Sequence, residues 1–179
     1  MSIVTERLTR DRFRELYADV KPNVELIDGV AEQKAMGSKP HAYLQAIVAR
    51  MLQDCGFRAA TELTLAISET WDPVPDVTGV LGPDTDELYH SQPPAVVIEI
   101  LSPSDRFTLL DQKCRQYAEW GILDILVFDP LSERVWCWDR TTDSLLYRIS
   151  DRYMFASKPD TKLQLDEVFR RLRAALGRH

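Results

Sequence analysis

A carboxylate and an ammonium stand at two positions where the sequence otherwise predicts a hydrophobic core. Glu99 interrupts the apolar run of residues 95–101, whose composition is typical of a strand buried on both faces. An ionised carboxylate in such a strand is costly unless it is paired or coordinates a metal ion. Glu99 therefore has two interpretations: a structural ion pair, or a functional group near the carboxyl end of the strand, where α/β sheets commonly open onto their sites.

Lys113 lies within the apolar stripe of a helix that we predict over residues 106–119. Leu110, Cys114 and Tyr117 stand at i−3, i+1 and i+4 from it, so it shares their face of the helix. A lysine there either extends along its stem to solvent or meets a carboxylate. Because this helix follows the strand of Glu99 through a short Ser-Pro turn, it should pack back over that strand, where a Glu99–Lys113 pair is geometrically reasonable.

Asp76, in "PVPDVTGV", stands inside another extended, apolar-rich run. An Asp after Pro is by itself mostly turn chemistry, so its value comes from the combination with Glu99. Two acidic side chains on neighbouring strands are an expected site for a hard cation. Magnesium takes one or two carboxylates and keeps several waters.

Four further groups of polar or aromatic residues stand out, and all but Asp105 allow two interpretations. Glu25, in "NVELIDGV", is either another acidic site residue or an exposed glutamate on an edge strand. His41, near the start of the first long helix, is either a partly buried histidine at the rim or a polar group that faces the same cleft. Asp105 is expected to cap the following helix together with two nearby serines. Trp136 and Trp138 are interpreted as packing or dimer-interface residues.

The surrounding pattern predicts an α/β sandwich, with a mixed sheet and helices on its faces. The local signals are helical periodicity closed by Gly56 and Gly121, and hairpin turns at Asp28-Gly29 and at residues 141–143. We expect helices over residues 9–18, about 40–55, 106–119 (starting from 102–105) and 165–176, hairpins over 24–36 and 134–150, strands over 61–69, 74–81, 95–101 and 124–130, and a loop over 82–94.

Composition limits the function classes. A chain of 179 residues, 45% hydrophobic and 28% charged, predicts one globular domain over residues 1–179. The sequence shows no apolar run long enough for a bilayer and no secretory signal, and its unpaired cysteines suit reduced thiols, so we expect a cytoplasmic protein without a membrane role. A net charge of −6 argues against a strong non-specific polyanion binder, but not against a nucleic-acid enzyme.

The blocks "PDVTGV", "PPAVVIEILSPSDR" and "KCRQYAEWGILDILVFDP" resemble the bacterial family described as "putative restriction endonuclease", which is assigned to the PD-(D/E)xK nuclease superfamily. The similarity extends over about residues 9–172. It implies a restriction-endonuclease-like α/β fold, with a central mixed sheet flanked by helices. It also implies Asp76 and Glu99 as ligands of Mg²⁺ or Mn²⁺, Glu25 as an additional acidic residue and Lys113 as the catalytic lysine.

The sequence departs from the superfamily pattern at Leu101, where the lysine two residues after the glutamate is expected. The resemblance is to members in which this lysine has moved to the following helix, as Lys113 has. The leading hypothesis is a metal-dependent nuclease that acts on DNA, with His41 in an auxiliary role, and a homodimer would suit a duplex substrate. The alternatives are a weakly active or inactive nuclease-fold module that binds nucleic acid or a partner protein, and a structural dimer in which the Glu99–Lys113 pair only specifies packing.

Overall fold

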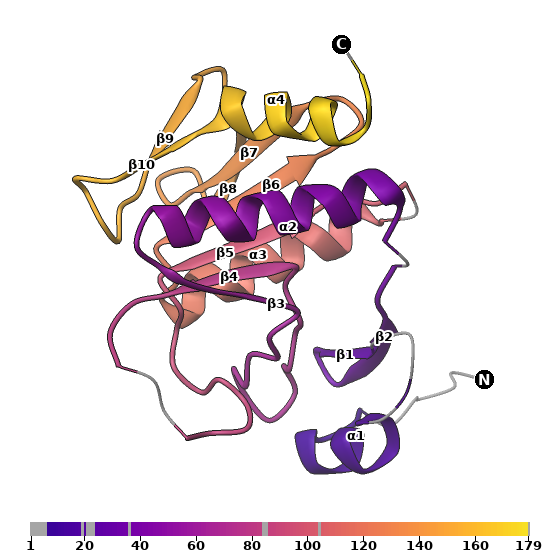
Figure 1. Ribbon diagram of the computed structural model, residues 1–179. Helices are drawn as coiled ribbons and strands as arrows, with labels where there is room; N and C mark the ends of the chain where they lie inside the picture. The colour runs from indigo at the N-terminus through magenta and orange to yellow at the C-terminus, as the bar shows by residue number, and fades with distance from the viewer. Residues whose placement is uncertain are drawn as a thin grey trace.

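The structure, a computed structural model, describes residues 7–18, 20, 24–35, 37–83, 86–103 and 105–178. Helices and strands alternate along these residues in the order shown in Figure 1. The helices are α1 (Arg10–Tyr17), α2 (Lys39–Asp54), α3 (Phe107–Trp120) and α4 (Leu165–Ala175). The strands are β1 (Val24–Ile27), β2 (Val30–Gln33), β3 (Arg58–Thr61), β4 (Val77–Val80), β5 (Val96–Ile100), β6 (Asp124–Asp129), β7 (Arg134–Asp139), β8 (Ser144–Tyr147), β9 (Arg152–Met154) and β10 (Lys162–Gln164).

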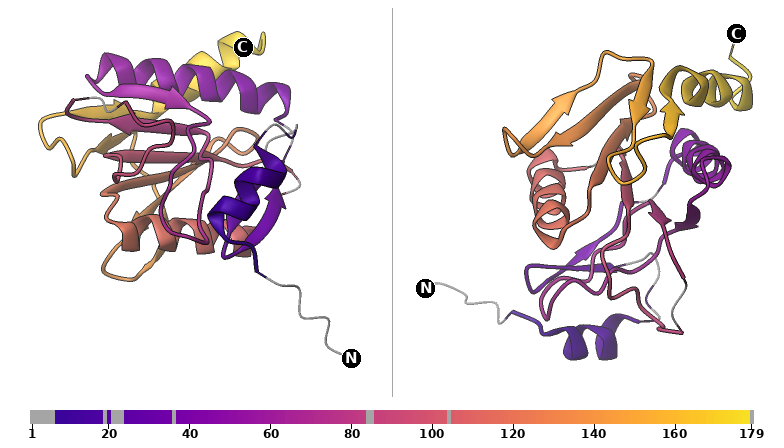
Figure 2. Two further views of the ribbon diagram at one scale, coloured as in Figure 1. Left: turned by 90° about the horizontal axis from the view of Figure 1, so that it is seen from below. Right: turned by 90° about the vertical axis from the view of Figure 1, so that its left-hand side faces the viewer.

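A mixed sheet forms the centre of the molecule, with strand order β3-β4-β5-β6-β7-β8. The central pair β5 and β6 is parallel and the other neighbouring pairs are antiparallel. Figure 2 shows α3 on one face of this sheet and α2 and α4 on the other. The α3 crossover between β5 and β6 is the connection that a parallel pair requires. The predicted α/β class, a mixed sheet flanked by helices, is therefore confirmed.

The two faces of β5 carry different chemistry. Val96, Ile98 and Ile100 pack into the core beneath α2 and α4, together with residues of those helices. Val97 belongs to the second core, which α3 covers. Because side chains alternate along a strand, Glu99 points to the α3 side as Val97 does. The odd-numbered face of β5 thus begins in a hydrophobic core and ends at a carboxylate.

Local signals explain most element boundaries. Asp28 and Gly29 both adopt positive φ, 50° and 76°, which is the backbone of the tight turn that joins β1 to β2. The Ser38 hydroxyl accepts a hydrogen bond from the backbone N–H of His41 and caps α2. Gly121 ends α3 in the left-handed conformation, at φ 109°. The predicted hairpin and helices are found at these places.

Two predicted features differ from the structure, the strand over residues 61–69 and the side-chain cap of α3. The alternation of residues 61–69 produces no regular strand, because the chain turns at Glu62, whose φ is 53°, and then pairs only through the isolated bridges of Leu65 and Ser68. Helix α3 begins at Phe107 without a side-chain cap. The Asp105 carboxylate instead accepts a hydrogen bond from the N–H of Ser102 and closes the turn before the helix. Ser104, the third residue of the predicted cap, lies outside the described residues.

The hairpin of β9 and β10 was not predicted, because each of its strands is only three residues long and shows no clear period. Trp136 and Trp138 pack against the core under α3, as one of their two interpretations required.

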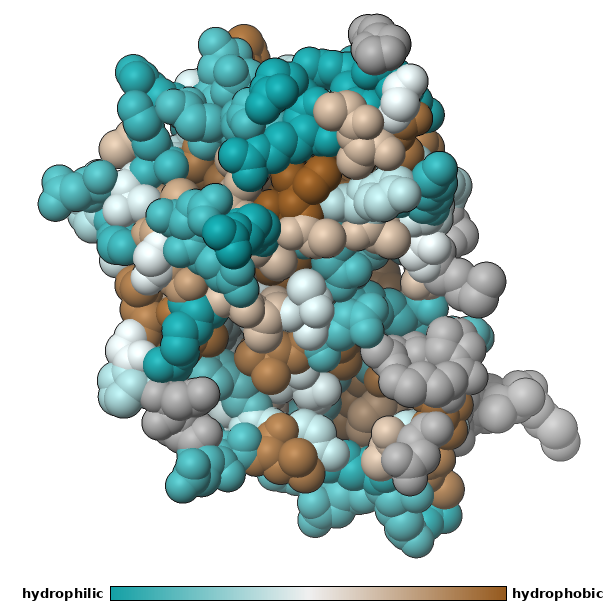
Figure 3. Space-filling model, in the orientation of Figure 1, coloured by the Kyte–Doolittle hydropathy of each residue, from teal (hydrophilic) through white to brown (hydrophobic). Residues whose placement is uncertain are grey.

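Within the described part of the chain, no helix is both long and apolar enough to cross a membrane. Figure 3 shows hydrophilic residues predominating over α4, at the top of that view.

Candidate active site

The site is centred on the carboxyl end of β5, where β4 no longer pairs with it. The register of the two strands places Val77 opposite Ile98, so Asp76 precedes β4 at the level of Glu99. There the Asp76 Oδ2 atom accepts a hydrogen bond of 2.7 Å from the N–H of Ile100. The β4–β5 ladder does not extend to Ile100, so the Asp76 carboxylate accepts the N–H of Ile100 in place of a β4 carbonyl. This hydrogen bond holds the Asp76 carboxylate beside Glu99.

Lys113 joins the hairpin of β1 and β2 to the central sheet. Its Nζ lies 2.8 Å from Glu25 Oε1 and 2.8 Å from Glu99 Oε1. All three side chains are buried, with 4% of Glu25, 6% of Glu99 and 5% of Lys113 exposed. Glu25 Oε1 also accepts a hydrogen bond of 2.6 Å from the N–H of Val74. Glu25 is thus a buried residue at the site, and not the exposed edge-strand glutamate of its other interpretation.

Tyr117 lies one helical turn beyond Lys113 and contacts the same carboxylate. Its hydroxyl donates a hydrogen bond of 2.8 Å to Glu99 Oε1, and its side chain is fully buried. In the sequence Tyr117 was taken only as part of the apolar stripe of α3. The i, i+4 spacing from Lys113 was the signal that could have identified it as a second donor to Glu99.

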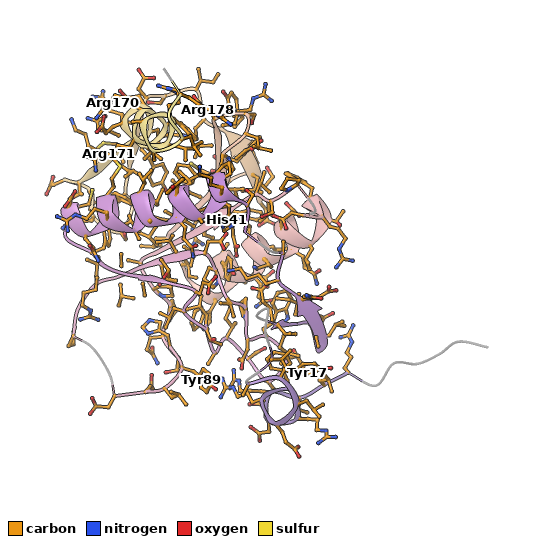
Figure 4. The ribbon with its side chains drawn as sticks, turned by 45° about the vertical axis from the view of Figure 1, so that its right-hand side comes forward. Tyr17, His41, Tyr89, Arg170, Arg171 and Arg178 are labelled. Atoms are coloured by element: carbon orange, nitrogen blue, oxygen red, sulfur yellow. The ribbon has the colours of Figure 1, made fainter. Side chains whose placement is uncertain are left out.

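Two further basic side chains, of Lys34 and His41, lie beside Asp76. Lys34, which follows β2, places its Nζ 2.8 Å from Asp76 Oδ1 and donates a hydrogen bond of 2.7 Å to the carbonyl of Val74. His41 Nε2, in the first turn of α2, lies 3.3 Å from Asp76 Oδ2. Figure 4 shows His41 on the inner side of α2, toward the sheet. The prediction that His41 faces the same cleft agrees with this position, whereas Lys34 had no signal in the sequence.

These residues open onto one pocket, which collects side chains from β1, the segment after β2, α2, β5 and α3. Leu101 lies in its wall, two residues after Glu99, where the superfamily pattern expects lysine. The pocket is lined by Glu25, Gln33, Lys34, Ala35, His41, Asp76, Glu99, Ile100, Leu101, Ser102, Asp105, Arg106, Leu109, Leu110 and Lys113.

The electrostatics of the site fix the charge of several groups. Burial favours neutral Asp76, but the hydrogen bond from His41 and the charge of Lys34 hold the pKa of Asp76 well below its ordinary value. Burial also favours neutral Lys113, yet the charges of Glu25 and Glu99 raise the pKa of Lys113 above its ordinary value. Asp76 is therefore an anion and Lys113 a cation at neutral pH.

The pKa values of Glu99, Tyr117 and His41 are all raised above their ordinary values. Burial raises the pKa of Glu99; the charge of Lys113 opposes this, and the charges of Asp76 and Glu25 add to it. Burial and the charge of Glu99 raise the pKa of Tyr117 well above its ordinary value, so Tyr117 remains a neutral donor. Burial lowers the pKa of His41, but its hydrogen bond to Asp76 and the charge of Asp76 raise it to a net value above the ordinary one. Perturbed groups clustered in one pocket are typical of active sites.

The residues present fit a hard divalent cation held by two carboxylates. Asp76 Oδ1 is buried and makes no hydrogen bond of normal geometry, its contact with Lys34 being an ion pair. Glu99 lines the same pocket and receives both of its donors on Oε1. No group of three or more acidic, histidine or cysteine residues in the described residues is arranged to hold an ion. Water would therefore complete the ligand set, as it commonly does for Mg²⁺.

Comparison with known proteins agrees with this architecture. The family model described as "Putative restriction endonuclease" matches residues 10–176. A crystal structure titled as a "putative nuclease belonging to DUF820", from Anabaena variabilis, superposes with a TM-score of 0.79 at 20% identity. The match covers 92% of this chain and 99% of that one. At this identity the likeness establishes the fold. No curated protein sequence matches the chain.

Proposed function

The chain belongs to the family described as "Putative restriction endonuclease", and from this premise we propose that it is a metal-dependent nuclease that hydrolyses phosphodiester bonds in DNA. One observation carries the proposal. Glu25, Asp76, Glu99 and Lys113 come from four separate parts of the chain and line one pocket, although each is expensive to bury alone. A protein that needed only stability would gain more from apolar side chains at these positions.

In this proposal Asp76 and Glu99 hold Mg²⁺ or Mn²⁺, whose chemistry when bound is to polarise a phosphoryl oxygen and lower the pKa of water. The N–H of Ile100 and the imidazole of His41 keep Asp76 Oδ2 in place, so the carboxylate is oriented before the ion arrives. Tyr117 does the same for Glu99.

Lys113 stabilises the negative charge that develops on the phosphate. An ammonium has three N–H donors, and two of them are directed at Glu25 and Glu99. One donor remains for a phosphate oxygen in the pocket that Lys113 lines. Because its neighbours hold Lys113 in the charged form, no proton has to be acquired before it acts. Glu25 positions this ammonium.

The surface around the pocket is consistent with an anionic polymer, and we place the DNA backbone on this side of the molecule. Arg106 lines the pocket and keeps 63% of its side chain exposed, and its pair with Glu32 would have to open for it to bind a phosphate. The arginines of α4 are a poorer candidate (Figure 4), because Arg170 and Arg171 do not line the pocket and both pair with Glu167. A homodimer would present two such sites to a duplex and is proposed on that ground.

The test is nicking of supercoiled plasmid with Mg²⁺ or Mn²⁺, for the wild type and for Glu99→Gln and Lys113→Ala. We expect metal-dependent nicking by the wild type and its loss in both variants. A matched control is Glu119→Gln, which removes an acidic side chain from an exposed position of α3. If the wild type cleaves none of several DNA and RNA forms with either metal, the proposed nuclease activity is refuted.

One observation favours a second candidate, a nuclease-fold module with little or no activity. The ammonium of Lys113 is engaged by two carboxylates and that of Lys34 by a third, so the anions of the site are already compensated. Such a module would bind nucleic acid or a partner protein without a metal ion. Calorimetry with Mn²⁺ separates the two: a wild type that binds Mn²⁺, with binding lost in Asp76→Ala, supports the nuclease, and no binding supports the module.

A further inference from the structure

Lys34 occupies an unusual place for a lysine. It follows the last residue of β2, its side chain is only 12% exposed, and its ammonium reaches into the pocket that holds the carboxylates. Its Nζ makes one hydrogen bond, to the carbonyl of Val74, and one ion pair, to Asp76 Oδ1. Unlike Lys113, it does not contact Glu99 or Glu25 among the ion pairs of the described residues.

The two oxygens of Asp76 are used differently. Oδ2 accepts from the N–H of Ile100 and lies 3.3 Å from His41 Nε2, so it is committed to the protein. Oδ1 has the Lys34 ammonium 2.8 Å away and no hydrogen bond of normal geometry, although Asp76 is only 2% exposed. Oδ1 is therefore the oxygen that Asp76 can offer to another cation.

A divalent ion and the Lys34 ammonium cannot both occupy this position. Ligand oxygens lie about 2.0–2.1 Å from Mg²⁺, so an ion on Oδ1 and its waters would crowd the ammonium 2.8 Å from the same oxygen. The charges also oppose each other, because like charges at short distance repel and this site is largely shielded from bulk water. Both effects favour withdrawal of the ammonium when the ion binds.

We propose that Lys34 holds the metal position of Asp76 in the metal-free protein and thereby sets the affinity of the site for divalent cations. The inference rests on the proposed metal-dependent function, because it concerns the same site. The lysine neutralises Asp76 when no ion is present, which removes the cost of a buried, unpaired carboxylate. The flexible stem of lysine lets the ammonium withdraw when the ion arrives. Lys34 is a positioning residue that competes with the ion.

The experiment is calorimetric titration of the whole chain with Mn²⁺, comparing the wild type with Lys34→Met and Lys34→Gln. Both substitutions remove the charge and keep most of the length of the stem. Lys162→Met is the matched control, since it removes the same charge from an exposed position of β10. We expect Mn²⁺ to bind at least about tenfold more tightly to both Lys34 variants, and with unchanged affinity to Lys162→Met. Circular dichroism melts identify any variant that is not folded.

The outcomes separate the inference from the function on which it rests. Mn²⁺ that binds the wild type but binds the folded Lys34 variants equally or more weakly overturns the role of Lys34 and leaves the metal site standing. Tighter binding by either folded Lys34 variant supports the inference, and adding Asp76→Asn to that variant should then abolish the gain. No Mn²⁺ binding by the wild type or by either folded variant refutes the metal site itself.

Discussion

Two ends of the central sheet each bury a carboxylate, and they do so in opposite ways. Asp124 begins β6, beside Val96 of β5, and none of its surface is exposed. Its oxygens accept hydrogen bonds of 2.8 Å from the Tyr153 hydroxyl, 2.7 Å from the N–H of Ala156 and 2.9 Å from that of Ser157. Neutral donors of one segment thus satisfy Asp124, which ties the chain after β9 to the sheet.

Asp76 and Glu99, at the other end of β5, are surrounded by cations as well as by neutral donors. Lys34 and His41 approach Asp76, Lys113 approaches Glu99, and these side chains line a pocket that does not include Asp124. Neutral donors are sufficient to bury a carboxylate, as Asp124 demonstrates. The additional charges at the pocket are therefore not explained by burial alone, and a charged ligand accounts for them better.

The largest effect on stability should follow from removing the Lys113 ammonium, which lies between Glu25 and Glu99. Lys113→Met leaves Glu25 and Glu99 facing each other without compensation, and we expect a loss of about 3–5 kcal/mol in the free energy of unfolding. Urea denaturation measures it. Adding Glu99→Gln should recover part of the loss. Arg12→Met, which breaks the exposed pair of Arg12 and Glu15, should cost below about 0.5 kcal/mol. A Lys113→Met loss as small as that of Arg12→Met contradicts the buried network.

Asp124→Ala should be nearly as destabilising, but for a different reason. It leaves three donors without an acceptor, at about 1 kcal/mol or more each, so we expect a loss of about 3 kcal/mol. The nicking rate of the folded fraction should not change. Asp139→Ala, at the end of β7, serves as the control for stability: it removes the acceptor of two N–H groups of an exposed turn, which water can replace, and should cost less than about 1 kcal/mol. An Asp124→Ala protein that is stable but inactive would reverse the comparison between the two ends of the sheet.

The sequence predicted the Glu99–Lys113 pairing because a charge inside an apolar period is visible in one dimension. Asp76 was a candidate only in combination with Glu99, and Glu25 only as one of two interpretations, since neither interrupts a long hydrophobic pattern; the family resemblance then implied a role for both. Lys34 was not predicted because it follows a strand in a segment without period, and only the folding of β1 and β2 toward β5 brings it to Asp76. The sequence pattern does not distinguish a buried lysine of this kind from an exposed one.

The elements of the fold were likewise predictable where the sequence carries a long hydrophobic pattern. Strand β5 and helices α2 and α3 carry long, regular patterns, and they occur where the patterns placed them. Residues 61–69 alternate as a strand does, but only Thr61 belongs to a ladder, that of β3 and β4, and the rest meet other segments through isolated bridges and single hydrogen bonds. Side-chain burial against the α3 core produces the alternation there without a ladder. A period of two thus indicates which side chains are buried, and not that a neighbouring strand exists.

A smaller effect should come from restoring lysine at its superfamily position. Leu101 lies in the pocket wall, on the face of Glu99, so Leu101→Lys can bring an ammonium to the site from the strand. In the Lys113→Met background we expect nicking about tenfold faster than in Lys113→Met alone. Leu109→Lys, elsewhere in the pocket, is the control and should restore nothing. Equal rates with lysine at 101 and at 109 would show that position does not matter and would weaken the assignment of Lys113.

The smallest effect concerns Tyr117, the neutral donor that makes this end of the sheet resemble the Asp124 end. Tyr117→Phe removes one hydrogen bond to Glu99 and leaves Lys113 on the same oxygen, so we expect a loss of about 1 kcal/mol in the free energy of unfolding. Tyr43→Phe, on the exposed side of α2, is the control and should change stability by less than about 0.5 kcal/mol. A Tyr117→Phe loss as large as that of Asp124→Ala would mean that neutral donors, and not the ammonium, carry the burial of Glu99. Lys113 would then contribute little to the burial of Glu99, and a charged ligand would be the better explanation of its presence.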